Sequence, residues 1–187
     1  KVVYHLYHNR REKGFHQVGG DWYYTDENGN KLLGLQEIDG KLYYLDNTES
    51  TSLVTGYLAK DKVLSPEQKE STRYPRTSSS TIIEPKIYSY YYFDAETGAA
   101  VTNQFIYADG HWYYFGKDGK ALLFDQVING QHLYFDYEGK QVKGDFVTDY
   151  KGTRYYDENS GELVTNQTRT INGVTYHFDE NGRAKQL

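Results

Sequence analysis

Short aromatic groups recur along the chain, and each follows a glycine by a few residues. The glycines of the first pair lie 20 residues apart, and the last four are separated by 20, 22 and 21 residues. The glycines and their aromatic groups are Gly20 with Trp22-Tyr23-Tyr24, Gly40 with Leu42-Tyr43-Tyr44, Gly110 with Trp112-Tyr113-Tyr114-Phe115, Gly130 with Leu133-Tyr134-Phe135, Gly152 with Tyr155-Tyr156, and Gly173 with Tyr176-His177-Phe178. A fixed period of this length is typical of a solenoid or repeat array.

A second turn follows each aromatic group, for example at Asp26-Glu27-Asn28-Gly29 and Lys117-Asp118-Gly119. The first turn is often Asp-Gly or Asn-Gly, which is typical of the type I′ turns that join two antiparallel strands. Each repeat therefore predicts a two-stranded β-hairpin. Because an isolated hairpin is only marginally stable in water, successive copies must pack together. The predicted fold is an all-β solenoid of stacked hairpin repeats, each about 20–22 residues long.

The repetition is interrupted once, at residues 61–86, which contain all 3 prolines of the chain. We expect residues 1–60 to form a first run of hairpins and residues 87–187 a second run, within one solenoid domain. Residues 61–86 are then an exposed loop or an elaboration of one repeat. Alternatives are a linker between two half-arrays and a crossing from another part of a larger chain. Residues 2–9 resemble the second strand of a repeat whose start is missing, so we expect a fragment of a longer protein.

Composition narrows the possible functions. The chain has 187 residues, 21 of them tyrosine, and 37% are hydrophobic, so aromatic rings must supply much of a thin core. The absence of cysteine excludes disulfides, thiol nucleophiles and cysteine-ligated zinc. A formal net charge of −5 disfavours nucleic acid and anionic membranes as partners. No apolar run approaches the roughly 20 residues that cross a bilayer, so membrane insertion is not expected.

Alternation along the second strand separates two sets of positions. Counted from the first-turn glycine, the third and fifth residues share one face and predict the core, as at Tyr23 and Phe115. The fourth residue points to the opposite face and always has a polar tip. A regular row of half-exposed rings suits binding better than packing alone. The fourth-position residues are Tyr24, Tyr44, Tyr114, Tyr134, Tyr156 and His177.

Such rings suit carbohydrate. A tyrosine face packs against the C–H side of a pyranose, while amides and ammonium groups bond its hydroxyls. With a two-residue turn at Asp39-Gly40, Gln36 lies opposite Tyr43, and Gln126 occupies the same position in a later repeat. The alternative is that these polar residues are solvated strand edges.

Two stretches resemble a known family: the stretch from Gly34 to Asp46 and the stretch from Gly130 to Gly144 are similar to repeats of the glucan-binding domains of secreted bacterial glucansucrases. The resemblance implies a β-solenoid with shallow pockets that hold an α-glucan segment through tyrosine, glutamine and lysine. Applied to this sequence, the resemblance implies two sites, a first and a second. The fourth-position rings of Tyr24 and Tyr114 are further candidates for binding. The residues are Gln36, Lys41, Tyr43 and Tyr44 in the first site, and Gln126, Tyr134 and Lys140 in the second.

The resemblance also implies partners and a setting. The ligand would be an α-glucan polysaccharide or an isomalto-oligosaccharide, and the parent a sucrose-dependent glucosyltransferase whose catalytic domain is covalently linked to this chain. The location would be secreted or on the cell surface. We expect one to three working pockets, because other repeats depart from the pattern, for example with Ile106 and His111.

Other functions remain open: a choline- or cell-wall-binding module, repeats that bind host glycans as in clostridial toxins, and a structural spacer. Catalysis by this chain is not expected, because most of its acids lie in repeated turns and no catalytic motif is present. The histidines form no metal-ligand motif, and no cofactor is expected. One tryptophan per choline-type repeat would be typical of a quaternary-ammonium cage, but the chain has only 2.

Overall fold

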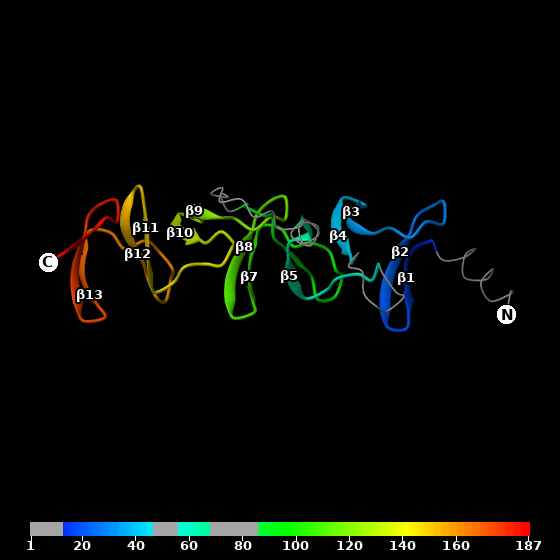
Figure 1. Ribbon diagram of the computed structural model, residues 1–187, viewed down its shortest axis with the longest axis horizontal. Coiled ribbons are helices and arrows are strands. Elements are labelled where there is room, and N and C mark those ends of the chain that lie inside the picture. Colours follow the sequence, from blue (N-terminus) through cyan, green and yellow to red (C-terminus); the bar gives the residue numbers. More distant parts are fainter. Residues whose placement is uncertain (1–12, 47–55, 68–85) are drawn as a thin grey trace, which may run out of the picture. The chain divides into compact units, whose positions relative to one another are not determined.

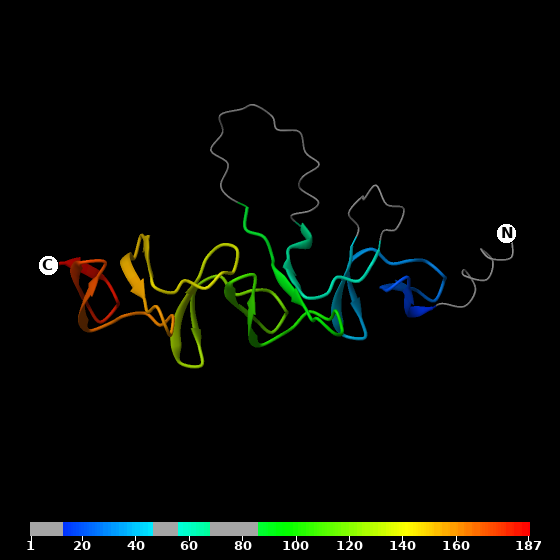
Figure 2. The same ribbon diagram turned by 90° about the horizontal axis from the view of Figure 1, so that it is seen from below.

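The computed structural model describes residues 13–46, 56–67 and 86–187. These residues are all-β, and their strands pair as antiparallel hairpins in chain order (Figures 1 and 2). This confirms the predicted architecture of two-stranded hairpins. At the C-terminal end, β15 adds a third strand to the last hairpin. The strands are β1 (Gly14–Val18), β2 (Asp21–Thr25), β3 (Gly34–Ile38), β4 (Lys41–Leu45), β5 (Lys62–Leu64), β6 (Tyr91–Phe93), β7 (Gln104–Ala108), β8 (His111–Phe115), β9 (Phe124–Ile128), β10 (Gln131–Phe135), β11 (Asp145–Asp149), β12 (Gly152–Tyr156), β13 (Gln167–Ile171), β14 (Val174–Phe178) and β15 (Ala184–Gln186).

The hairpin turns form for the reason that the sequence indicates. Asp39 and Gly40 have φ angles of 51° and 77°, the left-handed values that a type I′ turn needs at both central residues. Ile38 consequently pairs with Lys41, and Gln36 pairs with Tyr43. The two-residue loop predicted between β3 and β4 is therefore confirmed.

The hairpin β11–β12 differs by one residue from its prediction. Asp149 pairs with Gly152, so the loop consists of Tyr150 and Lys151, and Gly152 is already the first residue of β12. Counting from Gly152 therefore assigns each side chain of β12 to a position that is one too low: Tyr155, for example, is at the fourth position and not at the third. Tyr156 takes the buried fifth position, and the third position, occupied by aromatic or leucine side chains elsewhere, holds Arg154.

An aspartate closes the second turn of most repeats. In the turn after β2, Asp26 Oδ1 accepts hydrogen bonds from the backbone N–H groups of Asn28 and Asn30, at 2.9 and 2.8 Å. Such side-chain to backbone bonds explain the preference of turns for aspartate. The turn acids are therefore structural. The same arrangement recurs at Asp94, Asp136, Asp157 and Asp179.

Asp157 provides a prediction for acid stability. Its carboxyl has a lowered pKa because of the N–H of Ser160 first, and then the guanidinium of Arg169 and the N–H of Asn159. A lowered folded pKa stabilises the fold above the unfolded value, about 3.9 for aspartate, and this stabilisation is lost as the pH falls towards the folded value. We expect Asp157→Asn, which keeps the turn acceptors, to weaken the loss of stability below about pH 4. Denaturant titrations of both proteins across this range measure it, and identical acid dependence would contradict it.

Contacts divide the chain into two compact units, the first comprising Lys1–Gln104 with Phe115–Lys120 and the second comprising Phe105–Tyr114 with Ala121–Leu187. Within each unit, a strand carbonyl of one hairpin accepts from the segment that follows the next hairpin. In the first unit, Leu42 O accepts from Ala100 N at 2.8 Å, and in the second, His132 O accepts from Leu163 N at 2.9 Å. These bonds join successive repeats within a unit.

The expected interruption at 61–86 begins with a strand. Residues of β5, Lys62–Leu64, pair with β6, Tyr91–Phe93, so a hairpin spans the interruption. Residues 68–85, and the segment 2–9 expected to resemble a strand, lie outside the described residues. The division of the chain into 1–60, 61–86 and 87–187 stays a prediction.

The core follows the third and fifth positions of the second strands. The fifth-position side chains of Leu45, Phe93, Phe115, Phe135 and Phe178 are 0% exposed. Tyr23 and Tyr113 at the third position are each 4% exposed. The predicted core face is therefore confirmed at these positions.

Candidate functional site

The fourth-position rings of Tyr24, Tyr114 and Tyr134 are half-exposed, as predicted, but Tyr44 is buried. Tyr44 is 1% exposed, so its ring belongs to the core and offers no face to a ligand. Tyr24 and Tyr114 are half-buried because a phenylalanine from the first strand of the same hairpin lies against each ring. Phe15 meets Tyr24 at 4.9 Å and 71°, and Phe105 meets Tyr114 at 4.8 Å and 72°. The half-exposed rings of Tyr24 and Tyr114 therefore also pack within their own hairpins, and their role in binding stays a prediction.

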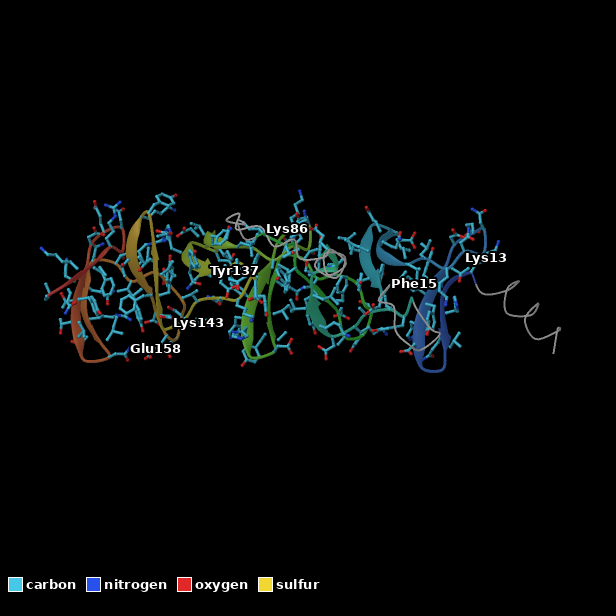
Figure 3. All side chains as sticks on the ribbon, viewed as in Figure 1. Lys13, Phe15, Lys86, Tyr137, Lys143 and Glu158 are labelled. Atoms are coloured by element: carbon cyan, nitrogen blue, oxygen red, sulfur yellow. The ribbon has the colours of Figure 1, made fainter. Side chains whose placement is uncertain are left out.

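In the first predicted group, Gln36 and Tyr43 are paired across β3 and β4. Tyr43 is half-buried against Phe15, with ring centroids 4.9 Å apart. Figure 3 labels Phe15 on the ribbon. Gln36, the strand partner of Tyr43, donates from Nε2 to the backbone oxygen of Leu33 at 2.7 Å. Lys41 instead lines a pocket that contains neither Gln36 nor Tyr43. Gln36 and Tyr43 therefore lie together, whereas Lys41 lines the pocket and the Tyr44 ring is buried; glucan binding by these four residues stays a prediction.

Each residue of the second predicted group has local contacts, and a glucan site at Gln126, Tyr134 and Lys140 stays a prediction. Gln126 repeats the bond of Gln36, donating from Nε2 to the backbone oxygen of Leu123 at 2.7 Å. Lys140 forms an ion pair with Glu138 at 3.6 Å. Tyr134 is half-buried beneath a charged cluster, with the Arg154 guanidinium 5.9 Å from its ring centroid. The recurring glutamine thus closes the bend before its strand.

The charged cluster around Arg154 is the most polar part of the interior. The Arg154 side chain is 5% exposed and forms ion pairs with Asp125 and with Asp149, the latter at 2.7 Å. Lys151 adds a third contact, to Asp125 at 3.2 Å. Burial alone would raise the pKa of Asp125, but the bonds from Arg154 and Lys151 outweigh it and lower the pKa. The cluster keeps its ionic form.

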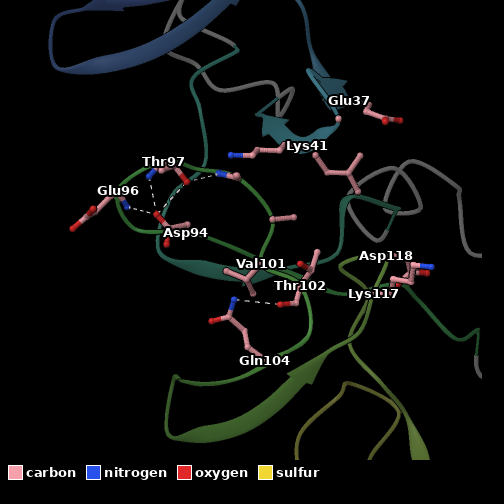
Figure 4. A pocket seen from close by; sticks show the side chains of 14 residues that line it. Glu37, Lys41, Asp94, Glu96, Thr97, Val101, Thr102, Gln104, Lys117 and Asp118 are labelled. Carbon is pink, nitrogen blue, oxygen red and sulfur yellow. Dashed lines mark hydrogen bonds between the residues drawn. The ribbon is translucent and has the colours of Figure 1, made fainter.

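An open pocket of about 750 Å³ lies in the first unit. It is enclosed by the end of the hairpin β3–β4, the turn after β6 and the turn after β8 (Figure 4). Its volume falls within the usual range for small-ligand sites. Its lining comprises Glu37, Gly40, Lys41, Leu42, Asp94, Glu96, Thr97, Ala99, Ala100, Val101, Thr102, Gln104, Lys117 and Asp118.

Local backbone geometry places the polar side chains of this pocket. Asp94 Oδ1 accepts from the backbone N–H groups of Glu96 and Thr97, each at 2.8 Å, which fixes the turn on one side. On the other side, Asn103 has a φ of 51°, which reverses the chain just before Gln104. Carboxylates, two ammonium groups, hydroxyls and an amide therefore surround a floor of small apolar side chains.

The sequence interpretation missed most of this pocket, because its residues come from three separate segments. One signal was present in the sequence: the tetrapeptide Val-Thr-Asn-Gln occurs at 101–104 and again at 164–167. An identical tetrapeptide in a degenerate array marks a position where several residue types are needed together. Reading the turns for glycines and aromatic residues alone overlooks it.

A metal site and a membrane-spanning helix are both absent from residues 13–46, 56–67 and 86–187. No cluster of three or more histidine, aspartate and glutamate side chains there could hold a metal ion. No helix in the same ranges is long and apolar enough to cross a membrane.

Comparison with known families identifies the repeats. The family described as "Choline-binding repeat" matches residues 126–167. The family described as "Putative cell wall binding repeat" matches residues 13–31, 103–121 and 169–184. The matched ranges include the hairpins β1–β2, β7–β8 and β11–β12 and lie on both sides of the interruption.

Curated relatives are enzymes much longer than this chain. Glucosyltransferase-I of Streptococcus downei is 41% identical over 97% of this chain and 14% of that protein. Glucosyltransferase-S of Streptococcus mutans serotype c is 34% identical over 89% of this chain and 14% of that protein. The chain therefore spans about one seventh of the length of these relatives.

Solved structures share the fold. The autolysin LytC of Streptococcus pneumoniae matches 92% of this chain and 33% of that chain, with a TM-score of 0.63 and 18% identity. Choline binding protein F of the same species matches 93% of this chain and 52% of that chain, with a TM-score of 0.58 and 20% identity. The chain is a region of cell-wall-binding repeats, homologous to a short part of the streptococcal glucosyltransferases.

Proposed function

We propose that this chain is a non-catalytic module that binds α-glucan and retains it near a glucosyltransferase. The observation that carries the proposal is the relationship to Glucosyltransferase-I, 41% identical across 97% of this chain but only 14% of that protein. A repeat region of this size within a glucosyltransferase is suited to holding the polymer that such an enzyme produces. Catalysis is assigned to the remainder of the parent protein.

The pocket in the first unit supports a carbohydrate ligand. Leu42, Ala100 and Val101 provide an apolar floor for the C–H faces of a sugar. Lys41 donates hydrogen bonds, and Gln104 both donates and accepts, which matches the two-sided bonding of sugar hydroxyls. We therefore assign the glucan to this pocket instead of to the two residue groups that the family resemblance implies.

Retention would arise from several weak contacts. Once one pocket holds a polymer, a second contact on the same chain forms at an effective concentration of roughly millimolar. The parent would be secreted or surface-bound, with its catalytic domain covalently linked to this module. Isomalto-oligosaccharides would be the short form of the ligand.

Choline is the second candidate, because the family that matches residues 126–167 is named for it. A quaternary ammonium binds over aromatic faces within about 6 Å of the ring centroid. In this chain Lys60 already lies 5.7 Å from the Trp22 centroid, and Lys143 lies 5.6 Å from that of Trp112. Internal cations at both tryptophans disfavour choline relative to glucan.

Affinity electrophoresis tests the proposal. We expect the chain to migrate more slowly in a native gel that contains dextran than in a gel without polymer, and added choline should not restore its migration. Bovine serum albumin is the control for sieving by the polymer. Equal migration in both gels would reject the glucan-binding module and favour a structural spacer. Restoration by choline would favour the second candidate.

A further inference from the structure

The second unit contains a copy of the segment that forms the pocket. Besides the shared tetrapeptide, an aspartate and a glycine recur at matching places, as Asp94 with Gly98 and as Asp157 with Gly161. The backbones agree closely: both glycines have a φ of 73°. The left-handed asparagines of the two tetrapeptides have φ angles of 51° and 52°. The two segments therefore have the same local structure.

Hydrogen bonds in the two copies also correspond. Gln104 donates from Nε2 to the backbone oxygen of Thr102 at 3.4 Å, and Gln167 donates to that of Thr165 at 3.1 Å. In each copy Oδ1 of the turn aspartate accepts from two backbone N–H groups and one hydroxyl. Each copy also bonds the preceding hairpin through one backbone N–H. A second polar pocket is consequently expected beside residues 157–167.

One arginine distinguishes the second copy. Arg169 donates from Nη1 to Asp157 Oδ2 at 2.8 Å and from Nε to Gln167 Oε1 at 2.9 Å. The corresponding position in the first copy, two residues after Gln104, is Ile106, and isoleucine has no polar hydrogen to donate. Asp94 and Gln104 line the open pocket. Their counterparts in the second copy, Asp157 and Gln167, are joined to each other by the Arg169 guanidinium.

We propose that Arg169 closes the second copy of the pocket to carbohydrate. The inference rests on the proposed function, because it takes the first copy as a glucan site. A charge-assisted bond between guanidinium and carboxylate is roughly twice as strong as a neutral hydrogen bond. A neutral sugar hydroxyl is therefore the weaker partner for Asp157, and Arg169 disfavours its binding there. Arg169 acts as the residue that determines how many repeats of this unit bind glucan.

Calorimetric titration with isomaltotriose tests this inference. Arg169→Ile reproduces the residue of the first copy, and we expect the number of trisaccharides bound per chain to increase by one. A second variant, Arg169→Ile with Leu163→Ala, also reproduces the small side chain of Ala100 and widens the opened site. Adding Gln167→Ala to either variant should remove the gained site. Arg183→Ile is the matched control, because the Arg183 side chain donates only to the backbone oxygen of Lys151 among the described residues, and its backbone bonds to Asp179 survive the substitution.

The outcomes distinguish the role of Arg169 from the proposed function. Binding by the unchanged chain with no gain in either Arg169 variant would overturn the role of Arg169 and leave the proposed function standing. No binding by any of the proteins would overturn both. A gain that persists after Gln167→Ala would place the new site elsewhere and overturn the inference. Circular dichroism of every variant verifies that the hairpins remain folded.

Discussion

Replacement of Arg154 by alanine should destabilise the second unit by about 3 kcal/mol. The substitution removes a long side chain that is 5% exposed, and it leaves Asp125 and Asp149 facing each other without their shared cation. For a chain of this length such a loss corresponds to a fall in the melting temperature of roughly 6–12 °C. Thermal unfolding followed by tyrosine fluorescence measures it.

A compensating swap tests the reason for the loss. At two junctions with the next hairpin, the place of Asp125 is taken by Phe15 or Phe146, whose ring lies against the third-position Tyr43 or Tyr176, at 4.9 and 5.1 Å. Replacing an ion pair by well-packed apolar groups is often neutral or stabilising. Arg154→Tyr combined with Asp125→Phe should therefore recover most of the stability.

Arg183→Ala provides the matched control for Arg154→Ala. Arg183 is exposed and lies in the same unit, so its removal should change the stability by at most about 0.5 kcal/mol. Equal melting temperatures for Arg154→Ala and the unchanged chain would show that the cluster contributes no stability. A double variant less stable than Arg154→Ala would contradict the equivalence of the ionic and aromatic junctions.

Removal of Lys41 and Gln104 together should weaken retention by dextran about 10- to 100-fold. Both side chains line the open pocket from different segments. Each is expected to lose a hydrogen bond to the sugar, and the bond from the charged lysine is the stronger one. Neither side chain is part of the buried core. Affinity electrophoresis over a range of dextran concentrations gives the change in dissociation constant.

The matched comparison is Gln36→Ala with Tyr43→Ala, the half-buried strand pair of the group implied by the family resemblance. If this pair weakens retention and the pocket variants do not, the glucan site is the junction between the first two hairpins. Tyr44→Ala is unsuitable for this comparison, because a ring that is 1% exposed leaves a cavity when truncated. A loss of retention by that variant would report unfolding.

Much of the binding geometry was beyond sequence interpretation because it depends on distant neighbours. Whether a fourth-position ring is exposed depends on the side chain that covers it, and Phe15 and Phe105 come from another strand. The turn before β12 was misplaced because Asp149-Tyr150-Lys151-Gly152 permits two loop positions locally. Pairing along the whole hairpin, with Asp145 opposite Tyr156, selects between them.

By itself, the sequence determined the repeat, the hairpins and their turns, since left-handed turn residues and alternation along five-residue strands act between close neighbours. It also determined the core positions that recur in most copies, such as Phe115 and Phe135. The tertiary structure alone decided which polar residues meet. Residues from 37–42, 94–104 and 117–118 line the pocket. In its second copy, Arg169 takes the place of Ile106. These contacts between separate segments depend on how one repeat packs on the next, which no local sequence pattern encodes.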